Sequence, residues 1–283
     1  MKPAVALWVL VAAASPASEI VFNVAFGSVP FWLVWLRLAV LVVILGLTVF
    51  VELARFLRAF CLAYGFQLAL MSLYALGRSS SLYYSLEARY GFTGAQSFSA
   101  VMVLVSVSPV VVWAFRRPDR FYFRIGNLRA PLAPTPVRWT LVAPLFALAA
   151  IVCVLVFLYF TGAVVSNVWT MAAWAVLFAA INAFGEEFIN RNVLVPAVER
   201  DFGTAHALLV SAFVFGIGHW NGLPAGVLGV LMTFTLGLAA GKAMVDTKGT
   251  FWSWFMHFVP DCALFYYWGI GSVVHATIGS GHL

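Results

Sequence analysis

The sequence predicts an all-α, polytopic transmembrane helical bundle. Of the 283 residues, 64% are hydrophobic and only 9% are charged, whereas a soluble domain carries about 25% charged residues. The mean hydropathy is +1.00, and the apolar residues form runs of about 20 residues, the length of helix that crosses a bilayer. Composition and pattern together exclude an ordinary soluble domain.

The apolar runs predict about eight spans. In chain order these lie near 31–50, 57–77, 97–115, 139–161, 167–185, 204–220, 223–241 and 250–270. A shorter apolar run from residue 4 to residue 14 follows Lys2 and precedes small residues, which is typical of a signal peptide or of a short first helix. Both alternatives place residue 20 outside.

The distribution of basic residues supports this segmentation, because cytoplasmic loops hold an excess of Lys and Arg. Because consecutive spans cross the membrane in opposite directions, each loop can be assigned to one side. The loops on one side of the membrane carry only Arg78 and Arg89. The other side carries Lys2, Arg55, Arg58, Arg116, Arg117, Arg120, Arg124, Arg129, Arg138, Arg200, Lys242 and Lys248. We expect the richer side to be cytoplasmic, and we interpret the net charge of +6 as membrane topology rather than a nucleic-acid-binding surface.

A basic, proline-bearing loop divides the chain into two halves. We expect residues 1–138 to form N-terminal transmembrane helices and this loop, 139–270 to form the functional core, and 271–283 to form a short external tail. The polar residues that occur at or inside spans belong to the second half. Three cysteines, Cys61, Cys153 and Cys262, lie in apolar stretches without CxxC spacing, which favours buried small side chains over a disulfide.

Glu186 and Glu187 lie side by side, with Arg191 close behind, next to an apolar run. On an α-helix, adjacent residues diverge by about 100°, whereas residues four apart share a face. We therefore expect Arg191 to neutralise Glu187 and to leave Glu186 as a carboxylate able to act as a base. The alternative is a juxtamembrane turn in which all three side chains face water.

Two histidines occur in the apolar runs that follow. His219 ends one run, and His257 precedes Asp261 by four residues in the last run, although Pro260 between them can bend the helix. Polar groups that are desolvated on one helix face require partners, and the glutamates are the natural ones. HExxH, serine-protease and paired-aspartate patterns are absent from the sequence. A glutamate-and-histidine site remains.

Three motifs in order resemble a known family. The run Glu186–Arg191 is similar to its EExxxR motif, Phe215–His219 to its FxxxH motif, and His257–Asp261 to its HxxxN/D motif. This is the CAAX protease and bacteriocin-processing (CPBP) group of intramembrane endopeptidases, which includes the CAAX prenyl endopeptidases. The resemblance covers roughly residues 140–268, and no motif covers the N-terminal half.

The resemblance implies a role for each motif residue. Glu186 would be the general base that activates water, with Glu187 and Arg191 as its orienting ion pair. His219 and His257 would position the water or polarise the scissile carbonyl.

Two positions depart from the family pattern. Asp261 would contribute to the oxyanion site or order a histidine; it stands where the prenyl endopeptidases have Asn, and an ionised carboxylate is a poor oxyanion donor. Asn190 occupies a position where the family often carries an aromatic residue. A divalent metal such as zinc is an open alternative, because two imidazoles and carboxylates suit it; its ligands would be Glu186, His219, His257 and Asp261.

We therefore expect an intramembrane endopeptidase in a bacterial plasma membrane, with its site open toward the cytoplasmic side. Its partners would be the lipid bilayer and a membrane protein or peptide substrate, not nucleic acid, and a prenylated substrate is not implied. One alternative is a proton-coupled transporter that uses the same glutamate, histidines and aspartate as a relay. Another is a non-catalytic immunity or scaffold protein of the same fold.

Overall fold

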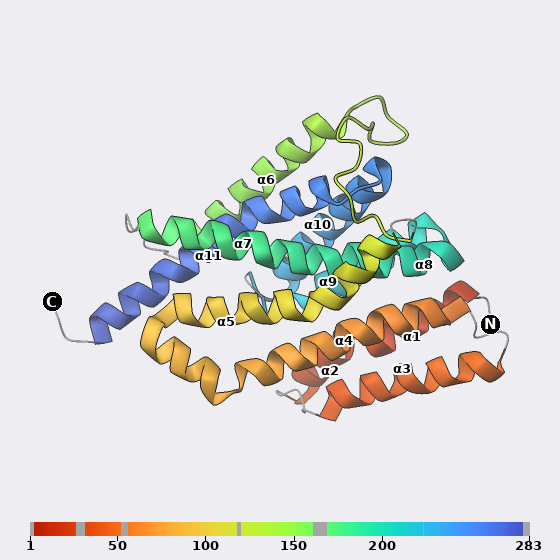
Figure 1. The fold of residues 1–283 in the computed structure, drawn as a ribbon, viewed down its shortest axis with the longest axis horizontal. Helices are drawn as coiled ribbons and strands as arrows, with labels where there is room; N and C mark the ends of the chain where they lie inside the picture. Colours follow the sequence, from red (N-terminus) through yellow and green to blue (C-terminus); the bar gives the residue numbers. More distant parts are fainter. Residues whose placement is uncertain are drawn as a thin grey trace. The chain divides into compact units, whose positions relative to one another are not determined.

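The computed structural model describes residues 3–26, 32–51, 56–117, 120–160, 169–222 and 224–279. Throughout these residues the regular elements are helices (Figure 1), which confirms the all-α prediction. The chain divides into two compact units. The first unit comprises Met1–Ser72 and Ile189–Lys242, and the second comprises Leu73–Phe188 and Ala243–Leu283.

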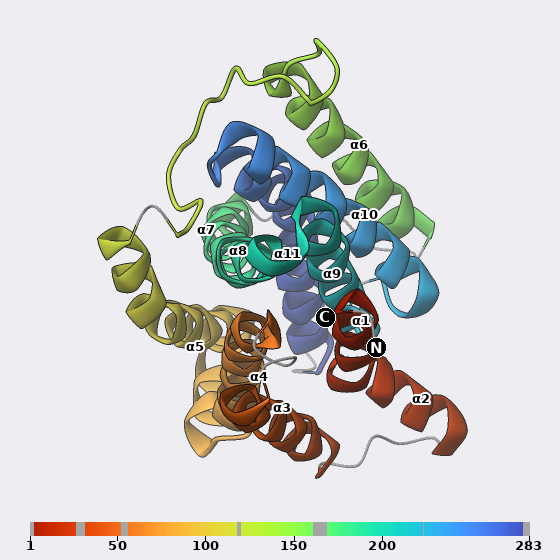
Figure 2. The same ribbon diagram turned by 90° about the vertical axis from the view of Figure 1, so that its right-hand side faces the viewer.

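The first unit consists mainly of N-terminal helices and of the helices that follow the glutamates. Its elements are α1 (Pro3–Ala14), α2 (Ala17–Phe26), α3 (Trp32–Phe50), the start of α4 (Arg58–Arg78), α8 (Leu194–Phe202), α9 (Thr204–Gly218) and most of α10 (Gly226–Thr247). A bend of 48° separates α1 from α2, at a break that contains Pro16. Contacts join α8 to α9 and α1 to α2, α3 and α9 (Figure 2).

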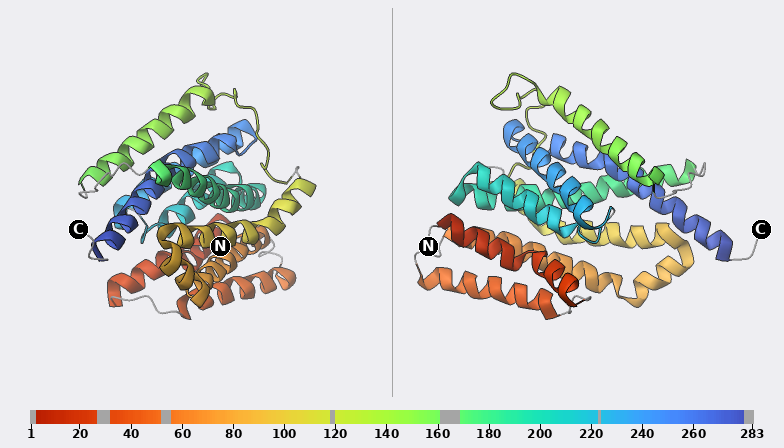
Figure 3. Two further views of the ribbon diagram at one scale, coloured as in Figure 1. Left: turned by 60° about the vertical axis from the view of Figure 1, so that its left-hand side comes forward. Right: turned by 180° about the vertical axis from the view of Figure 1, so that it is seen from behind.

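The second unit is built around one helix pair. Its elements are α5 (Ser81–Arg116), α6 (Trp139–Phe160), α7 (Trp169–Glu187) and α11 (Phe251–Gly279). The most extensive contact in this unit is between α7 and α11, and α11 also lies against α6 and α5 (Figure 3). Ala175, Ala179 and Ala183 recur every four residues on α7 and are all buried. Small side chains at this spacing allow a neighbouring helix to approach closely.

Hydrogen bonds hold the loop of residues 120–138 against the turn between α10 and α11. Arg124 Nε donates to the carbonyl of Lys248 at 2.7 Å, and Trp252 Nε1 donates to the carbonyl of Leu128 at 3.0 Å. Because Trp252 lies in the first turn of α11, this loop determines where α11 begins. All of these residues belong to the second unit.

Five helical stretches in the described residues are long and apolar enough to cross a membrane. They are Arg58–Arg78, Ser81–Arg116, Trp139–Phe160, Met171–Phe202 and Gly226–Thr247, and the bent pair of α1 and α2 makes a sixth if it is one span. Trp35–Phe50 and Thr204–Gly218 are apolar but shorter. The other predicted span, 250–270, is helical as part of α11 without meeting the same criteria. Length and composition thus give five or six spans, where the sequence predicts about eight.

Candidate active site

A buried carboxylate and imidazole lie at the centre of the contact between α7 and α11. His257 Nδ1 lies 2.9 Å from Glu187 Oε1, and Ser253 Oγ donates to Glu187 Oε2. The three side chains are almost completely buried. An ionised carboxylate can only accept hydrogen bonds, so Nδ1 of His257 carries the proton. In the neutral ring the other nitrogen, Nε2, then has the lone pair.

Two further carboxylates lie near Nε2 of His257. Glu186 Oε2 is 3.7 Å away and Asp261 Oδ2 is 3.6 Å away, so Pro260 does not separate His257 from Asp261. Asp261 Oδ2 also accepts a hydrogen bond of 3.0 Å from Asn182 Nδ2. Both distances to Nε2 exceed a direct hydrogen bond and lie within the range of an ion pair. The side chain of Glu186 is 34% exposed, although its Oε2 atom, which faces His257, is buried.

Four-residue spacing on both helices produces this cluster. Ser253, His257 and Asp261 lie on one face of α11, and Asn182 and Glu186 lie on one face of α7, since residues four apart nearly coincide around a helix. Sequence reasoning did not identify Ser253 or Asn182. The signal was available, because each lies four residues before a predicted site residue on the same apolar helix.

The structure gives Glu187 partners that the sequence did not predict. Within the second unit Glu187 accepts hydrogen bonds from His257 and Ser253, and the predicted neutralisation of Glu187 by Arg191 stays a prediction. The argument for a shared face assumed an unbroken α-helix. Phe188–Val193 is instead a π-helical segment, in which hydrogen bonds run from i to i+5 and the α-helical spacing does not apply.

Arg191 and His219 belong to the first unit, where Phe215 contacts both of them. The guanidinium of Arg191 is fully buried and lies 4.2 Å from the ring centroid of Phe215, a cation–π geometry. His219 Nδ1 lies 2.8 Å from the carbonyl oxygen of Phe215. A carbonyl can only accept, so Nδ1 carries the proton and Nε2 has the lone pair.

Asn190 stands where the family often carries an aromatic residue. It is buried in the first unit, and both its side-chain oxygen and its backbone carbonyl accept hydrogen bonds. Its side-chain oxygen accepts from Gln67 Nε2 at 3.1 Å, and its backbone carbonyl accepts from Ser211 Oγ at 2.7 Å. An aromatic side chain could make only the second of these bonds. The Asn at this position therefore connects the π-helical segment to α4 and α9.

The predicted metal set does not have the geometry of a metal site. Among the described residues, no group of three or more His, Cys, Asp and Glu side chains could hold a metal ion. The arrangement most similar to a metal site is that of His257 Nε2 with the carboxylates of Glu186 and Asp261, which lie 3.7 and 3.6 Å from this nitrogen. Metal chemistry through Glu186, His219, His257 and Asp261 is not supported.

Comparison with known proteins bears on the same segment. Residues 166–263 match the family model described as type II CAAX prenyl endopeptidase Rce1-like. Neither the curated proteins nor the solved structures gave a match to the chain. The matched segment contains the six predicted site residues, which are Glu186, Glu187, Arg191, His219, His257 and Asp261. The resemblance read from the three ordered motifs is thus confirmed, since over residues 166–263 the chain is similar to the CAAX prenyl endopeptidase family.

Proposed function

We propose that this chain is an intramembrane endopeptidase that hydrolyses a peptide bond of a membrane-associated protein or peptide. The observation that supports this most strongly is the contact of Glu187 with His257, with Glu186 and Asp261 near the opposite ring nitrogen. It lies inside the segment that matches the endopeptidase family model. A base, an orienting group and a polar cavity are what peptide hydrolysis requires in a bilayer.

In this proposal Glu186 is the general base. It takes a proton from a water molecule, whose oxygen attacks the scissile carbonyl carbon and forms a tetrahedral intermediate. The protonated Glu186 then gives the proton to the leaving amine as the carbon–nitrogen bond breaks, so that a carboxyl and an amine terminus are released. The partial exposure of Glu186 supports this role, because the attacking water must reach it.

The other residues hold the groups that act on water and on the carbonyl. Glu187 keeps the proton on Nδ1 of His257, so that Nε2 accepts a hydrogen bond from the attacking water. Asp261, with Asn182, borders the same water position. His219 stabilises the oxyanion as an imidazolium, because Nδ1 of the neutral ring already donates to the carbonyl of Phe215 and Nε2 must take up a second proton before it can donate.

Glu186→Gln tests the proposed base with the smallest change of shape. The purified protein is incubated in detergent with a library of membrane peptides, and the products are identified by mass spectrometry. We expect the wild type to cleave and Glu186→Gln to lose about 100- to 10,000-fold in kcat, the usual contribution of a general base. Glu87→Gln is the matched control, since Glu87 is an exposed glutamate on α5.

Two results would reject the proposal. Cleavage by Glu186→Gln at the wild-type rate would show that Glu186 is not the base. Proton-dependent uptake into liposomes by a protein that cleaves no peptide would instead favour the transporter.

A further inference from the structure

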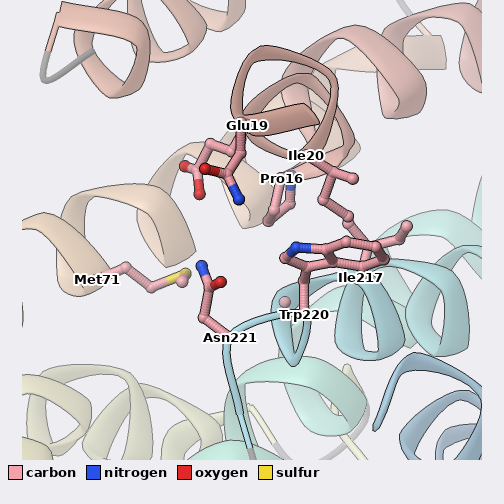
Figure 4. Close-up of a pocket in the computed structure, with 9 residues that line it drawn as sticks. Pro16, Glu19, Ile20, Met71, Ile217, Trp220 and Asn221 are labelled. Carbon is pink, nitrogen blue, oxygen red and sulfur yellow. The ribbon is translucent and has the colours of Figure 1, made fainter. Parts of the chain in front are cut away.

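A pocket with converging polar groups lies within the first unit. It is formed at the break between α1 and α2, by one residue of α4, and by the end of α9 with the turn after it; the lining is Pro16, Glu19, Ile20, Asn23, Met71, Ile217, Gly218, Trp220 and Asn221. Figure 4 shows the carboxylate of Glu19, the amide of Asn221 and the ring nitrogen of Trp220 directed toward the same space. A few polar groups among apolar ones are typical of a ligand pocket.

The polar groups of this pocket offer both donors and acceptors. Trp220 is a donor only, the carboxylate of Glu19 accepts, and the amides of Asn23 and Asn221 do both. Within the part of the chain that the structure describes, Asn23, Trp220 and Asn221 make no side-chain hydrogen bond. They are therefore available to a ligand that carries hydrogen-bonding groups of both kinds.

The formal charge of the pocket favours an uncharged ligand. Glu19 forms an ion pair with Arg37, whose side chain is only 5% exposed. The pair has no net formal charge, so a lysine side chain or a free carboxylate would gain little from binding beside it. An extended peptide segment with uncharged side chains fits better, because each residue presents one N–H and one C=O.

The pocket also shares its wall with a candidate catalytic residue. Gly218 and Trp220, which flank His219 in the chain, both line it. Backbone hydrogen bonds hold this turn in place, from His219 N to Gly216 O at 3.0 Å and from Gly222 N to His219 O at 2.8 Å. A ligand in the pocket therefore lies against the turn that positions the His219 imidazole.

We infer that this pocket is a substrate subsite that binds an extended, uncharged segment of the peptide, with Trp220 and Asn221 determining specificity. This inference rests on the proposed endopeptidase function. It gives α2 and α4, which no motif covers, a role in selecting the substrate.

Steady-state kinetics of two variants test the subsite. Trp220→Phe removes the indole N–H and Asn221→Ala removes the amide. We expect each to raise KM about three- to tenfold with kcat unchanged, because each loses one hydrogen bond made equally in ground and transition states. Trp169→Phe is the control, since Trp169 is 82% exposed at the start of α7 and outside the pocket. Unchanged KM in both pocket variants would overturn the inference.

Binding without turnover separates this inference from the proposed function. A fluorescein-labelled short peptide with uncharged side chains is titrated into Glu186→Gln, alone and combined with Trp220→Phe or Asn221→Ala. We expect the combined variants, and a probe with N-methylated backbone amides, to bind about three- to tenfold more weakly. Equal binding throughout would reject the subsite even if cleavage requires Glu186. Pocket-dependent binding by a protein that cleaves nothing would keep the subsite and reject the peptidase.

Discussion

At the scale of single residues, the chemistry depends on how His257 is oriented. A neutral imidazole has one donating and one accepting nitrogen, and the partner of one nitrogen decides the role of the other. Glu187 lies against Nδ1 at 2.9 Å, which leaves Nε2 to face Glu186 and Asp261. Ser253 in turn donates to the second oxygen of Glu187. In the proposed mechanism Ser253 is therefore a positioning residue, because it acts on Nε2 only through Glu187.

Ser253→Ala tests this chain of contacts. The variant leaves one oxygen of a buried carboxylate without its hydroxyl donor, so Glu187 and the His257 ring can shift. We expect kcat to fall about tenfold, in line with the loss of a hydrogen bond to a charged group, while KM stays at the wild-type value. The KM-against-kcat comparison distinguishes a positioning role from general loss of folded protein, which would lower the active fraction and leave the per-site kcat unchanged.

A matched serine provides the control for this prediction. Ser108 is exposed on α5, and its hydroxyl donates to the carbonyl of Val105 in its own helix at 2.9 Å. Ser108→Ala removes a hydrogen bond of similar kind far from any carboxylate. A reduction in kcat of the same size in both variants would contradict the positioning role of Ser253.

At the scale of elements, the loop of residues 120–138 positions α11. Gly126 has a φ of +84°, and a Cβ added there would lie 2.7 Å from the Cα of Gly249 and 2.7 Å from the carbonyl oxygen of Thr247. Only glycine meets both requirements, a left-handed backbone and contact with another backbone. The close approach of Gly126 and Gly249 thus allows the loop to pair with the turn that precedes α11.

Gly126→Ala should destabilise the protein by more than the cost of the left-handed backbone conformation alone. The left-handed conformation costs about 1–2 kcal/mol for a residue with a Cβ, and the clash with backbone adds about 1–3 kcal/mol. Gly226→Ala is a close control, because Gly226 has a φ of +71° with nothing within 4 Å of an added Cβ. We expect free energies of unfolding, measured by denaturation in mixed micelles, to fall by about 3 kcal/mol for Gly126→Ala and about 1 kcal/mol for Gly226→Ala. Equal losses would show that the contact with Gly249 contributes nothing.

At the scale of the whole molecule, composition was enough to predict the class of fold. Polar residues in apolar runs also identified Glu186, Glu187, His257 and Asp261, because a desolvated charge is costly and requires partners. The π-helical segment Phe188–Val193 was beyond prediction, since it depends on which backbone groups pair rather than on residue type. The predicted shared face of Glu187 and Arg191 assumed α-helical spacing, and their pairing stays a prediction.

Other features could not be predicted for a different reason. Gln67 and Asn190 are 123 positions apart, so only the fold brings their amides together. Ser253 and Asn182 could have been found from their four-residue spacing to predicted site residues, but the partner that each one bonds depends on which helix lies opposite. The number of spans differed from the prediction because three predicted spans do not meet the length and composition criteria. Trp35–Phe50 is short, α9 ends after 15 residues at the turn that carries His219, and the 250–270 run contains His257 and Asp261.

The side of the membrane on which α11 begins follows from the same loop. Arg124 and Leu128 of the 120–138 loop bond to Lys248 and Trp252, so the loop and the start of α11 share one side. His257 lies six residues after Phe251, about 9 Å along the helix at about 1.5 Å per residue. The site on α11 is therefore nearer to the side that holds this basic loop, which the charge rule predicts to be cytoplasmic.

Accessibility of single cysteines tests that orientation. In a variant with Cys61, Cys153 and Cys262 replaced by alanine, Ser79→Cys and Arg120→Cys place exposed thiols at the two ends of α5. The part of α5 after its break at Gly91 has about 25 residues and spans about 37 Å, more than the roughly 30 Å of a hydrocarbon core. We expect a membrane-impermeant maleimide to label Ser79→Cys only in right-side-out vesicles and Arg120→Cys only in inverted ones. The reverse pattern would place the opening of the site on the external side, and labelling of both thiols from one side would mean that α5 does not cross the bilayer.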